Sequence, residues 1–157
     1  MTGMRGFTLI EMLVTVSLVA LLSAIAFPLL ELAERRSNER ELRIALRQIR
    51  NALDGYKQAV DEGRVVEPTK GSGYPPNLDA LVDGVPDAKN PTRNQKIYFL
   101  RRLPADPLLA APPNAAPEWG LRSYASSPGD PQPGLDVFDV YSRSGATGLN
   151  GIAYKDW

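Results

Sequence analysis

Cysteine and histidine are both absent from the 157 residues of the sequence. Without cysteine there is no disulfide framework, no thiolate zinc site and no cysteine nucleophile. Without histidine the chain lacks the most common general base and the most common transition-metal ligand. A basic excess is absent as well, because 18 basic residues balance 18 acidic ones, whereas general nucleic-acid binders carry a strong basic excess. We therefore expect neither an enzyme nor a nucleic-acid-binding protein.

A single long apolar segment, residues 7–30, stands out in a chain that is otherwise polar. Its one charged residue is Glu11. As an α-helix the segment would be roughly 36 Å long, which is enough to cross a bilayer core of about 30 Å. We therefore expect one membrane-spanning helix followed by a soluble region. Glu11 is a functional candidate, because a charge in hydrocarbon is costly unless it has a partner.

Two ordinary interpretations of this segment leave part of it unexplained. A cleaved secretory signal would have Arg5 before its apolar core and a small-x-small cleavage site, for which residues 23–26 would serve. The core of such a signal is about 7–15 residues long, and this run is longer and contains a carboxylate. An ordinary single-pass anchor explains the length of the run but not the position of Glu11.

Residues 4–11, Met-Arg-Gly-Phe-Thr-Leu-Ile-Glu, resemble the class III signal of type IV pilins and type II secretion pseudopilins. The resemblance implies that a prepilin peptidase removes a leader, residues 1–6, by cutting after Gly6. Phe7 then becomes the N-methylated first residue, and the apolar helix is kept. Glu11 falls where the family has a glutamate, which is expected to neutralise the new ammonium group on a neighbouring subunit. Alternatively, Glu11 is a protonated carboxyl group that the membrane merely tolerates.

A second helical pattern follows the apolar segment. Apolar residues recur at positions i, i+3, i+4 and i+7, which predicts an amphipathic helix. They are Leu42, Ala45, Leu46, Ile49, Ala52, Leu53, Tyr56, Ala59 and Val60. We expect this stem, residues 31–62, to continue the helix of residues 7–30 through Pro28, with Gly63 as its C-cap.

The start of the stem, residues 31–41, is charged almost throughout. Glu31 and Arg35 have the i, i+4 spacing and the order that favour an ion pair on a helix. Glu39 and Arg43 have the same spacing and order. We interpret the segment as a solvent-exposed neck. The alternative is that its surplus arginines meet carboxylates on adjacent copies of the chain.

Beyond the stem the composition changes, since every one of the 14 prolines except Pro28 lies after residue 67. Proline at this density excludes a helix bundle, so residues 63–157 are expected to form a small loop-rich head. A short helix at residues 78–82 would be capped by Asn77 and ended by Gly84.

Two segments of the head, residues 121–125 and 135–141, carry β-branched and aromatic residues and are expected to be strands joined by a Pro/Gly-rich turn. Residues 96–103 are either extended or helical. The predicted fold class is α+β. The pilin resemblance implies the lollipop form of that family, in which a long N-terminal α-helix packs on a small antiparallel sheet with Pro/Gly-rich loops.

Four motifs of the head are similar to the major, G-type pseudopilins of type II secretion. They are Gly73-Tyr74-Pro75-Pro76 with residues 78–82, residues 103–107, residues 137–142 and Asp156-Trp157. The absence of cysteine agrees, because many type IV pilins close a C-terminal loop with a disulfide. One departure is that Trp119-Gly120 follows a proline-rich insert, whereas in the subfamily Trp-Gly comes directly after Asp-Pro.

The same resemblance implies a calcium ion in the C-terminal loop. Calcium takes 6–8 oxygen ligands, yet residues 142–155 contain no acidic residue. Asp139, Asn150 and Asp156 are the nearby oxygen donors that the sequence offers. The alternative is a loop without a cofactor, held by turns and by the packing of Trp157.

The resemblance as a whole implies a structural subunit that polymerises with copies of itself into a filament for type II secretion, and not an enzyme. The implied partners are the prepilin peptidase, an inner-membrane assembly platform and minor pseudopilins. The implied location is the bacterial inner membrane, with the N-terminus in the cytoplasm and the head in the periplasm. Two alternatives remain, a type IV pilus subunit for adhesion, twitching or DNA uptake, and a membrane-anchored periplasmic binding domain.

Overall fold

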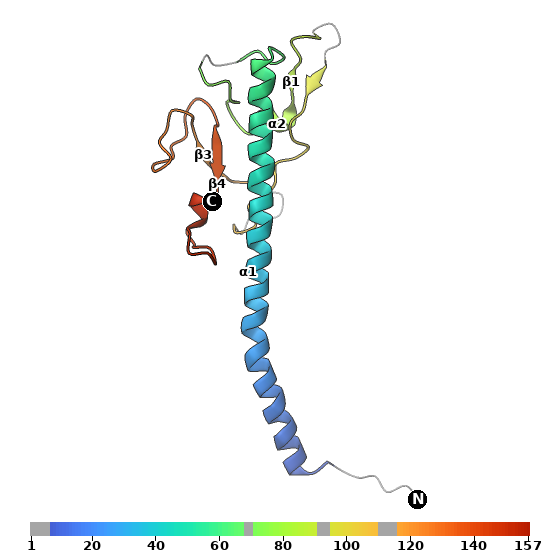
Figure 1. The fold of residues 1–157 in the computed structure, drawn as a ribbon. Helices are drawn as coiled ribbons and strands as arrows, with labels where there is room; N and C mark the ends of the chain where they lie inside the picture. The colour runs from blue at the N-terminus through green and yellow to red at the C-terminus, as the bar shows by residue number, and fades with distance from the viewer. Residues whose placement is uncertain (1–6, 68–70, 91–94, 110–115) are drawn as a thin grey trace, which may run out of the picture. The chain divides into compact units, whose positions relative to one another are not determined.

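The longest element of the computed structural model is α1, Leu9–Asp61, a helix of 53 residues that continues through Pro28 (Figure 1). This confirms the expectation of one unbroken helix. The structure describes residues 7–67, 71–90, 95–109 and 116–157, so the predicted leader and its cleavage position, Gly6, lie outside the described residues. The chain divides into two units, Met1–Ser37 and Asn38–Trp157, and α1 contributes to both.

In the first unit, the described part of α1 has an exposed apolar surface. Every large apolar side chain from Phe7 to Leu30 is more than half exposed, and Phe7 itself is 80% exposed. By length and composition α1 can cross a membrane, and no residue of its most apolar window is buried. Contiguous apolar surface of this kind is typical of contact with a membrane or with another protein.

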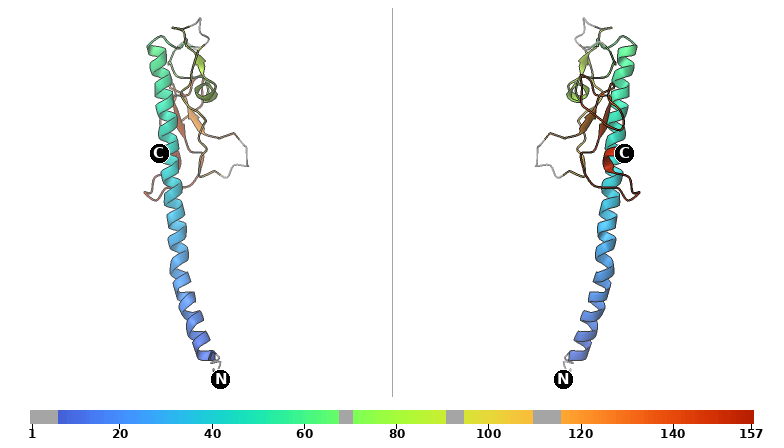
Figure 2. Two further views of the ribbon diagram at one scale, coloured as in Figure 1. Left: turned by 90° about the vertical axis from the view of Figure 1, so that its right-hand side faces the viewer. Right: turned by 90° about the vertical axis from the view of Figure 1, so that its left-hand side faces the viewer.

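In the second unit, one stripe of α1 is buried beneath the rest of the unit. Figure 2 shows the strands and loops of this unit gathered along one side of the helix. The buried apolar residues of α1 are Leu42, Ala45, Leu46, Ile49, Ala52, Leu53, Tyr56 and Ala59. The predicted stripe is therefore confirmed, and each fully buried leucine or isoleucine contributes about 1.5–3 kcal/mol to folding.

The C-terminus of α1 is closed by a Schellman motif at Gly63. Gly63 has φ of +69°, a left-handed conformation that glycine adopts without steric cost. Its N–H donates to Val60 O at 2.8 Å, and the N–H of Arg64 donates to Ala59 O at 2.8 Å. These two bonds satisfy carbonyl groups that the helix end leaves unpaired, so the predicted C-cap is confirmed.

The next element is α2, Asp79–Asp83. The side-chain oxygen of Asn77 accepts a hydrogen bond from the Ala80 N–H at 3.0 Å, so the predicted capping residue is confirmed. The helix ends at Asp83 and is followed by its C-cap, Gly84, whose φ is +75°.

A short antiparallel ribbon follows, formed by β1, Val85–Pro86, and β2, Lys96–Ile97. After β2 the chain turns, because the N–H groups of Phe99 and Leu100 both donate to Leu81 O, at 3.0 and 2.9 Å. Of the two alternatives for residues 96–103, extended or helical, the structure has an extended strand at Lys96–Ile97 alone.

The second ribbon pairs β3, Gly120–Arg122, with β4, Asp139–Tyr141, in antiparallel register with Leu121 opposite Val140. The prediction of two paired strands is confirmed, but both are shorter than expected. The first strand ends because Ser123 begins a turn, in which its carbonyl oxygen accepts from the Ser126 N–H at 3.1 Å.

The two ribbons are separate two-stranded sheets rather than one sheet. Within the second unit, α2 and β1 lie to the right of α1 and β3 and β4 to its left in the view of Figure 1, while the view of Figure 2, turned by 90°, shows both groups along the same side of the helix. A 3₁₀ helix, η2, Tyr154–Asp156, follows near the end of the chain. The predicted α+β class is confirmed.

Candidate functional site

The N-terminus of α1 is closed by reciprocal hydrogen bonds between Thr8 and Glu11. The backbone N–H and the hydroxyl group of Thr8 both donate to Oε2 of Glu11, at 3.0 and 3.1 Å. In return, the backbone N–H of Glu11 donates to Oγ1 of Thr8 at 3.2 Å. This is a capping box, in which a threonine and a glutamate three residues later satisfy each other's unpaired N–H groups.

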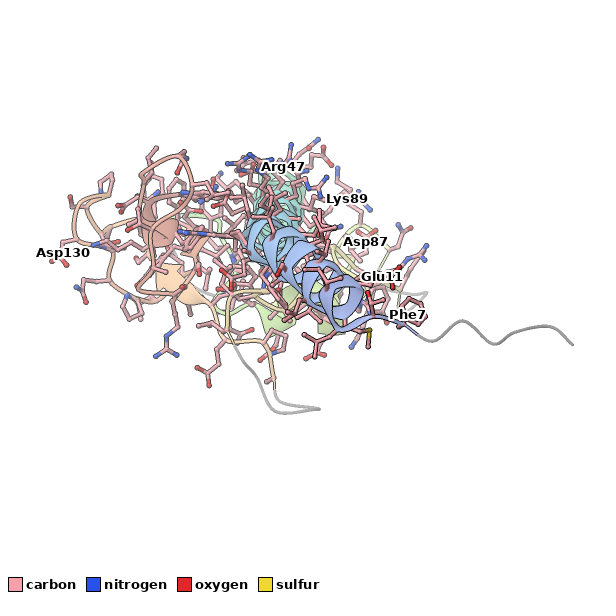
Figure 3. The ribbon with its side chains drawn as sticks, turned by 90° about the horizontal axis from the view of Figure 1, so that it is seen from below. Phe7, Glu11, Arg47, Asp87, Lys89 and Asp130 are labelled. Carbon is pink, nitrogen blue, oxygen red and sulfur yellow. The ribbon has the colours of Figure 1, made fainter. Side chains whose placement is uncertain are left out.

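The predictions from the sequence assign Glu11 to a neighbouring subunit and miss this local contact. The signal was present, because Thr-x-x-Glu before an apolar run is the sequence signature of a capping box. Figure 3 shows Phe7 and Glu11 together at the start of α1. Both hydrogen bonds from Thr8 end on Oε2, so Oε1 is the oxygen of Glu11 that Thr8 does not use.

Glu39 has partners that the sequence did not predict. It was expected on a solvent-exposed neck and paired with Arg43, but the structure places it in a buried position. Its Oε1 accepts from the Leu149 N–H at 2.6 Å and from the Tyr154 hydroxyl at 3.0 Å. The reason for the correction is that residues 143–157, hereafter the C-terminal segment, fold against this turn of α1. The other charged side chains of the neck are exposed, as expected.

Arg50, three turns further along α1, binds three oxygen atoms of the last part of the chain. Its Nε donates to Oδ1 of Asp139 at 2.7 Å. Its Nη2 donates to the backbone oxygens of Trp157 and Val140, at 2.7 and 3.2 Å. The other carboxylate oxygen of Asp139 accepts from Arg122 at 3.3 Å. Both oxygens of this aspartate are therefore held by arginines.

Two of the four head motifs meet at a buried carboxylate, Asp106. Its Oδ2 accepts from the hydroxyl group of Ser142 at 2.6 Å, and its Oδ1 accepts from the Leu108 N–H at 2.9 Å. Beside it, Nε1 of Trp119 donates to Pro104 O at 2.9 Å. The motif at residues 103–107 is thereby joined to the end of β4. This hydrogen bond accounts for a polar residue in each of the two motifs, Asp106 in one and Ser142 in the other.

The Gly-Tyr-Pro-Pro motif also packs against the segment before β4. The ring of Tyr74 meets the ring of Phe138 edge-on, with centroids 5.0 Å apart, and Tyr124 meets it at 5.3 Å. The Val137 N–H donates to Pro75 O at 2.8 Å. Aromatic pairs of this geometry stabilise by about 0.5–1.5 kcal/mol beyond their buried area.

Asp87, just after β1, is a head carboxylate with a lowered pKa. The backbone N–H of Lys89 donates to it at 3.0 Å, the Asn90 side chain at 3.3 Å, and the Arg64 guanidinium lies at 3.5 Å. The Lys89 N–H first, and then Asn90 and Arg64, lower the pKa of Asp87 below its ordinary value. Figure 3 shows Asp87 and Lys89 close together.

Comparison with known proteins places this arrangement in a family. Residues 1–27 match the family model described as the Prokaryotic N-terminal methylation motif. A relative from Vibrio cholerae, named type II secretion system core protein G, is 30% identical over 151 residues, which are 96% of this chain and 86% of the relative. The chain belongs to the core protein G family of type II secretion systems.

Further members of the core protein G family give the same result. The relative of that name from Klebsiella pneumoniae is 32% identical over 89% of this chain and 86% of its own length. The one from Aeromonas hydrophila is 29% identical over 96% of this chain and 87% of its own length. No solved structure matches the chain.

The calcium donors expected from resemblance to the core protein G family do not fit a calcium ion as the structure places them. Asp139 is bound by two arginines, and Oδ1 of Asn150 accepts from the Ile152 N–H at 3.0 Å. Asn150 and Asp156 line a cavity of about 520 Å³ that three arginine side chains also line. These arginines are Arg43, Arg47 and Arg50. Positive charge opposes a divalent cation, and calcium needs 6–8 oxygens.

Proposed function

We propose that the chain is a pseudopilin, a structural subunit that polymerises with copies of itself into the periplasmic filament of a type II secretion system and catalyses no reaction. Before assembly, a prepilin peptidase cuts after Gly6, and the new N-terminal residue, Phe7, is methylated. The partners are other copies, minor pseudopilins and an inner-membrane assembly platform. The N-terminus lies in the cytoplasm and the head in the periplasm.

The observation that carries this proposal is the uncovered apolar half of α1 with a glutamate at its start. In the membrane these side chains face lipid, and in a filament they face the helices of neighbouring copies. Lipid tails are as apolar as leucine, so this transfer gains little from the hydrophobic effect. Charged groups near the start of the helix then decide which packing register is favoured, because an unpaired charge in an apolar surrounding is costly.

Glu11 is suited to setting this register. Its Oε2 is engaged with Thr8, while Oε1 faces no donor from Thr8. After cleavage, the methylated amine of Phe7 is still a cation, and it can bind this oxygen on an adjacent copy. The capping box gives the carboxylate hydrogen-bond partners in the monomer. The ion pair between Glu11 and the amine of Phe7 on an adjacent copy then stabilises the assembled filament.

Intact-mass measurement tests the processing step. The chain is expressed with and without a prepilin peptidase. The expected result is loss of residues 1–6 and gain of one methyl group only when the peptidase is present. A Gly6→Leu variant serves as the control and should keep the precursor mass. An unprocessed wild-type chain beside an active peptidase would overturn the proposed maturation.

Filament formation is tested by two matched variants in a host deleted for the gene. Glu11→Ala should be processed normally but fail to restore export of proteins to the medium. Thr8→Val removes the hydroxyl of the capping box and keeps the carboxylate, so it should restore most of the export. Equal loss in both variants would mean that Glu11 acts only as a helix cap. Normal export and missing pili in the deletion strain would identify a type IV pilus subunit instead.

A further inference from the structure

The C-terminal segment is attached to α1 through three charged side chains that share one face of the helix. Glu39, Arg43 and Arg50 are separated by steps of i+4 and i+7, which keep side chains on the same face. The guanidinium of Arg43 lies over the ring of Trp157, 4.3 Å from its centroid. These charged contacts add to the apolar packing of Tyr154 and Trp157 against the core.

The oxygens that Arg50 binds are of the kinds that calcium takes in proteins, namely one side-chain carboxylate oxygen and two backbone oxygens. The carboxylate and one backbone oxygen belong to β4, and the other backbone oxygen belongs to Trp157. A guanidinium carries five N–H donors in a fixed planar fork, so one side chain can join all three. Arg50 thereby links the strand, the end of the C-terminal segment and the helix.

The middle of the C-terminal segment is held by an anion. Glu39 is only 6% exposed, and it accepts from the Leu149 N–H and the Tyr154 hydroxyl. The rings of Tyr154 and Trp157 also meet, with centroids 5.0 Å apart. The segment is thus attached to α1 at its middle and at Trp157 by groups that belong to the chain.

We propose that Arg50 takes the role of a bound cation in this chain, closing the C-terminal segment on α1 and β4 so that the head folds without calcium. The proposal depends on contacts within the second unit, Asn38–Trp157, alone and can be tested independently of filament assembly. It also explains why a segment with no acidic residue between positions 142 and 155 still closes.

The test uses the full-length chain purified in detergent. Thermal unfolding is followed by tryptophan fluorescence in excess calcium chloride and in EDTA, for the wild type, Arg50→Met and Arg47→Met. Arg47 is the matched control, because it is an exposed arginine one helical turn before Arg50 on the same helix. Limited digestion with trypsin at Arg143 and Lys155 reports whether the C-terminal segment has come away from the helix.

The expected result is a wild-type Tm that is the same in calcium and in EDTA. Arg50→Met should lower the Tm by at least about 4 °C and speed cleavage within the segment, and Arg47→Met should do neither. Two results would overturn the proposal. One is a wild-type Tm that calcium raises by about 4 °C or more over its value in EDTA, and the other is an equal Tm for Arg50→Met and Arg47→Met. If Arg50→Met does not fold, Arg50→Lys replaces it, and a lysine that fully restores the wild-type Tm would overturn the role assigned to the guanidinium fork.

Discussion

The two halves of α1 have the same backbone conformation and opposite surroundings. From Leu9 to Leu30 the large apolar side chains are exposed all round the helix, whereas from Leu42 to Ala59 a single apolar stripe is buried under the head. The first half is apolar all round, as expected for a helix that lipid or other helices surround, and the second is amphipathic. The difference shows that both halves form a helix in different surroundings. The distribution of apolar residues around the helix determines what each half packs against.

The two glutamates of α1 extend this comparison. Glu11 lies in the exposed apolar half and finds its partner three residues away in Thr8. Glu39 lies under the head and finds its partners at sequence separations of 110 and 115 residues. The carboxylate of the first half is therefore bonded within its own helical turn, and the one of the second half is bonded to a distant part of the chain.

The largest expected effect is a loss of stability when a cavity is made in the core beneath the second half of α1. Leu53 is fully buried and Leu21 is 62% exposed. Leu53→Ala should reduce the free energy of unfolding of the head by about 2–5 kcal/mol, because it removes packed atoms and leaves a cavity. Leu21→Ala in the same detergent should leave it unchanged. Denaturant unfolding followed by tryptophan fluorescence measures both, and equal losses would contradict the division of the helix.

Replacement of each of the two glutamates by alanine should have opposite effects on stability and on filament formation. Glu39→Ala should cost the head about 3 kcal/mol, because two hydrogen bonds to a charged group are lost and the Tyr154 hydroxyl is left in a buried site without its acceptor. Glu11→Ala should leave the melting temperature of the head unchanged and should abolish pelletable filaments. Thermal melts and filament sedimentation on both variants make the comparison. Loss of filaments without loss of stability in Glu39→Ala would contradict the assignment.

A smaller effect is expected where the head motifs meet. Ser142→Ala removes one hydrogen bond from the Asp106 carboxylate and should lower the free energy of unfolding by about 1.5 kcal/mol. Ser144→Ala is the control, since its hydroxyl accepts a long hydrogen bond from the Ala146 N–H, at 3.4 Å. Chemical denaturation of both variants checks the prediction, which fails if their midpoints coincide.

The smallest expected effect is a pH dependence of the Tm that arises from Asp87 in the head. The lowered pKa of Asp87 means that its stabilising contribution is present above the ordinary aspartate pKa of about 4 and is lost as the pH falls through the lowered value. The Tm of the wild type should therefore fall below about pH 4 more steeply than that of Asp87→Asn. Melting curves between neutral and acidic pH measure this slope, and parallel curves for the two proteins would rule out the contribution.

Much of the fold could be predicted because its determinants lie within one or two helical turns. The stripe on α1, the glycine cap at Gly63 and the capping residue Asn77 all depend on neighbours a few positions away. The strands were predicted in the right places and in the right pairing but too long, because β-propensity does not report where a turn such as the one at Ser123 interrupts the ladder.

The candidate site divides in the same way. The resemblance to the pilin signal lies in a few consecutive residues, including Phe7 to Glu11. The capping box, which was not predicted, also has its sequence signature within these residues. By contrast, nothing near Arg50 in the sequence indicates that it binds Asp139, which is 89 residues away. The same holds for Asp106 and Ser142, which are 36 residues apart.

The sequence by itself therefore determined the long helix, its apolar and amphipathic halves, the family signal and the loop-rich character of the head, since hydrophobic period, capping and proline content act locally. Only the tertiary structure decided which charges are paired: Glu39 with the C-terminal segment and Arg50 with the end of β4. The physical reason is that a charged side chain binds whatever the folded chain brings within about 3 Å of it, and that neighbour depends on the packing of the whole head.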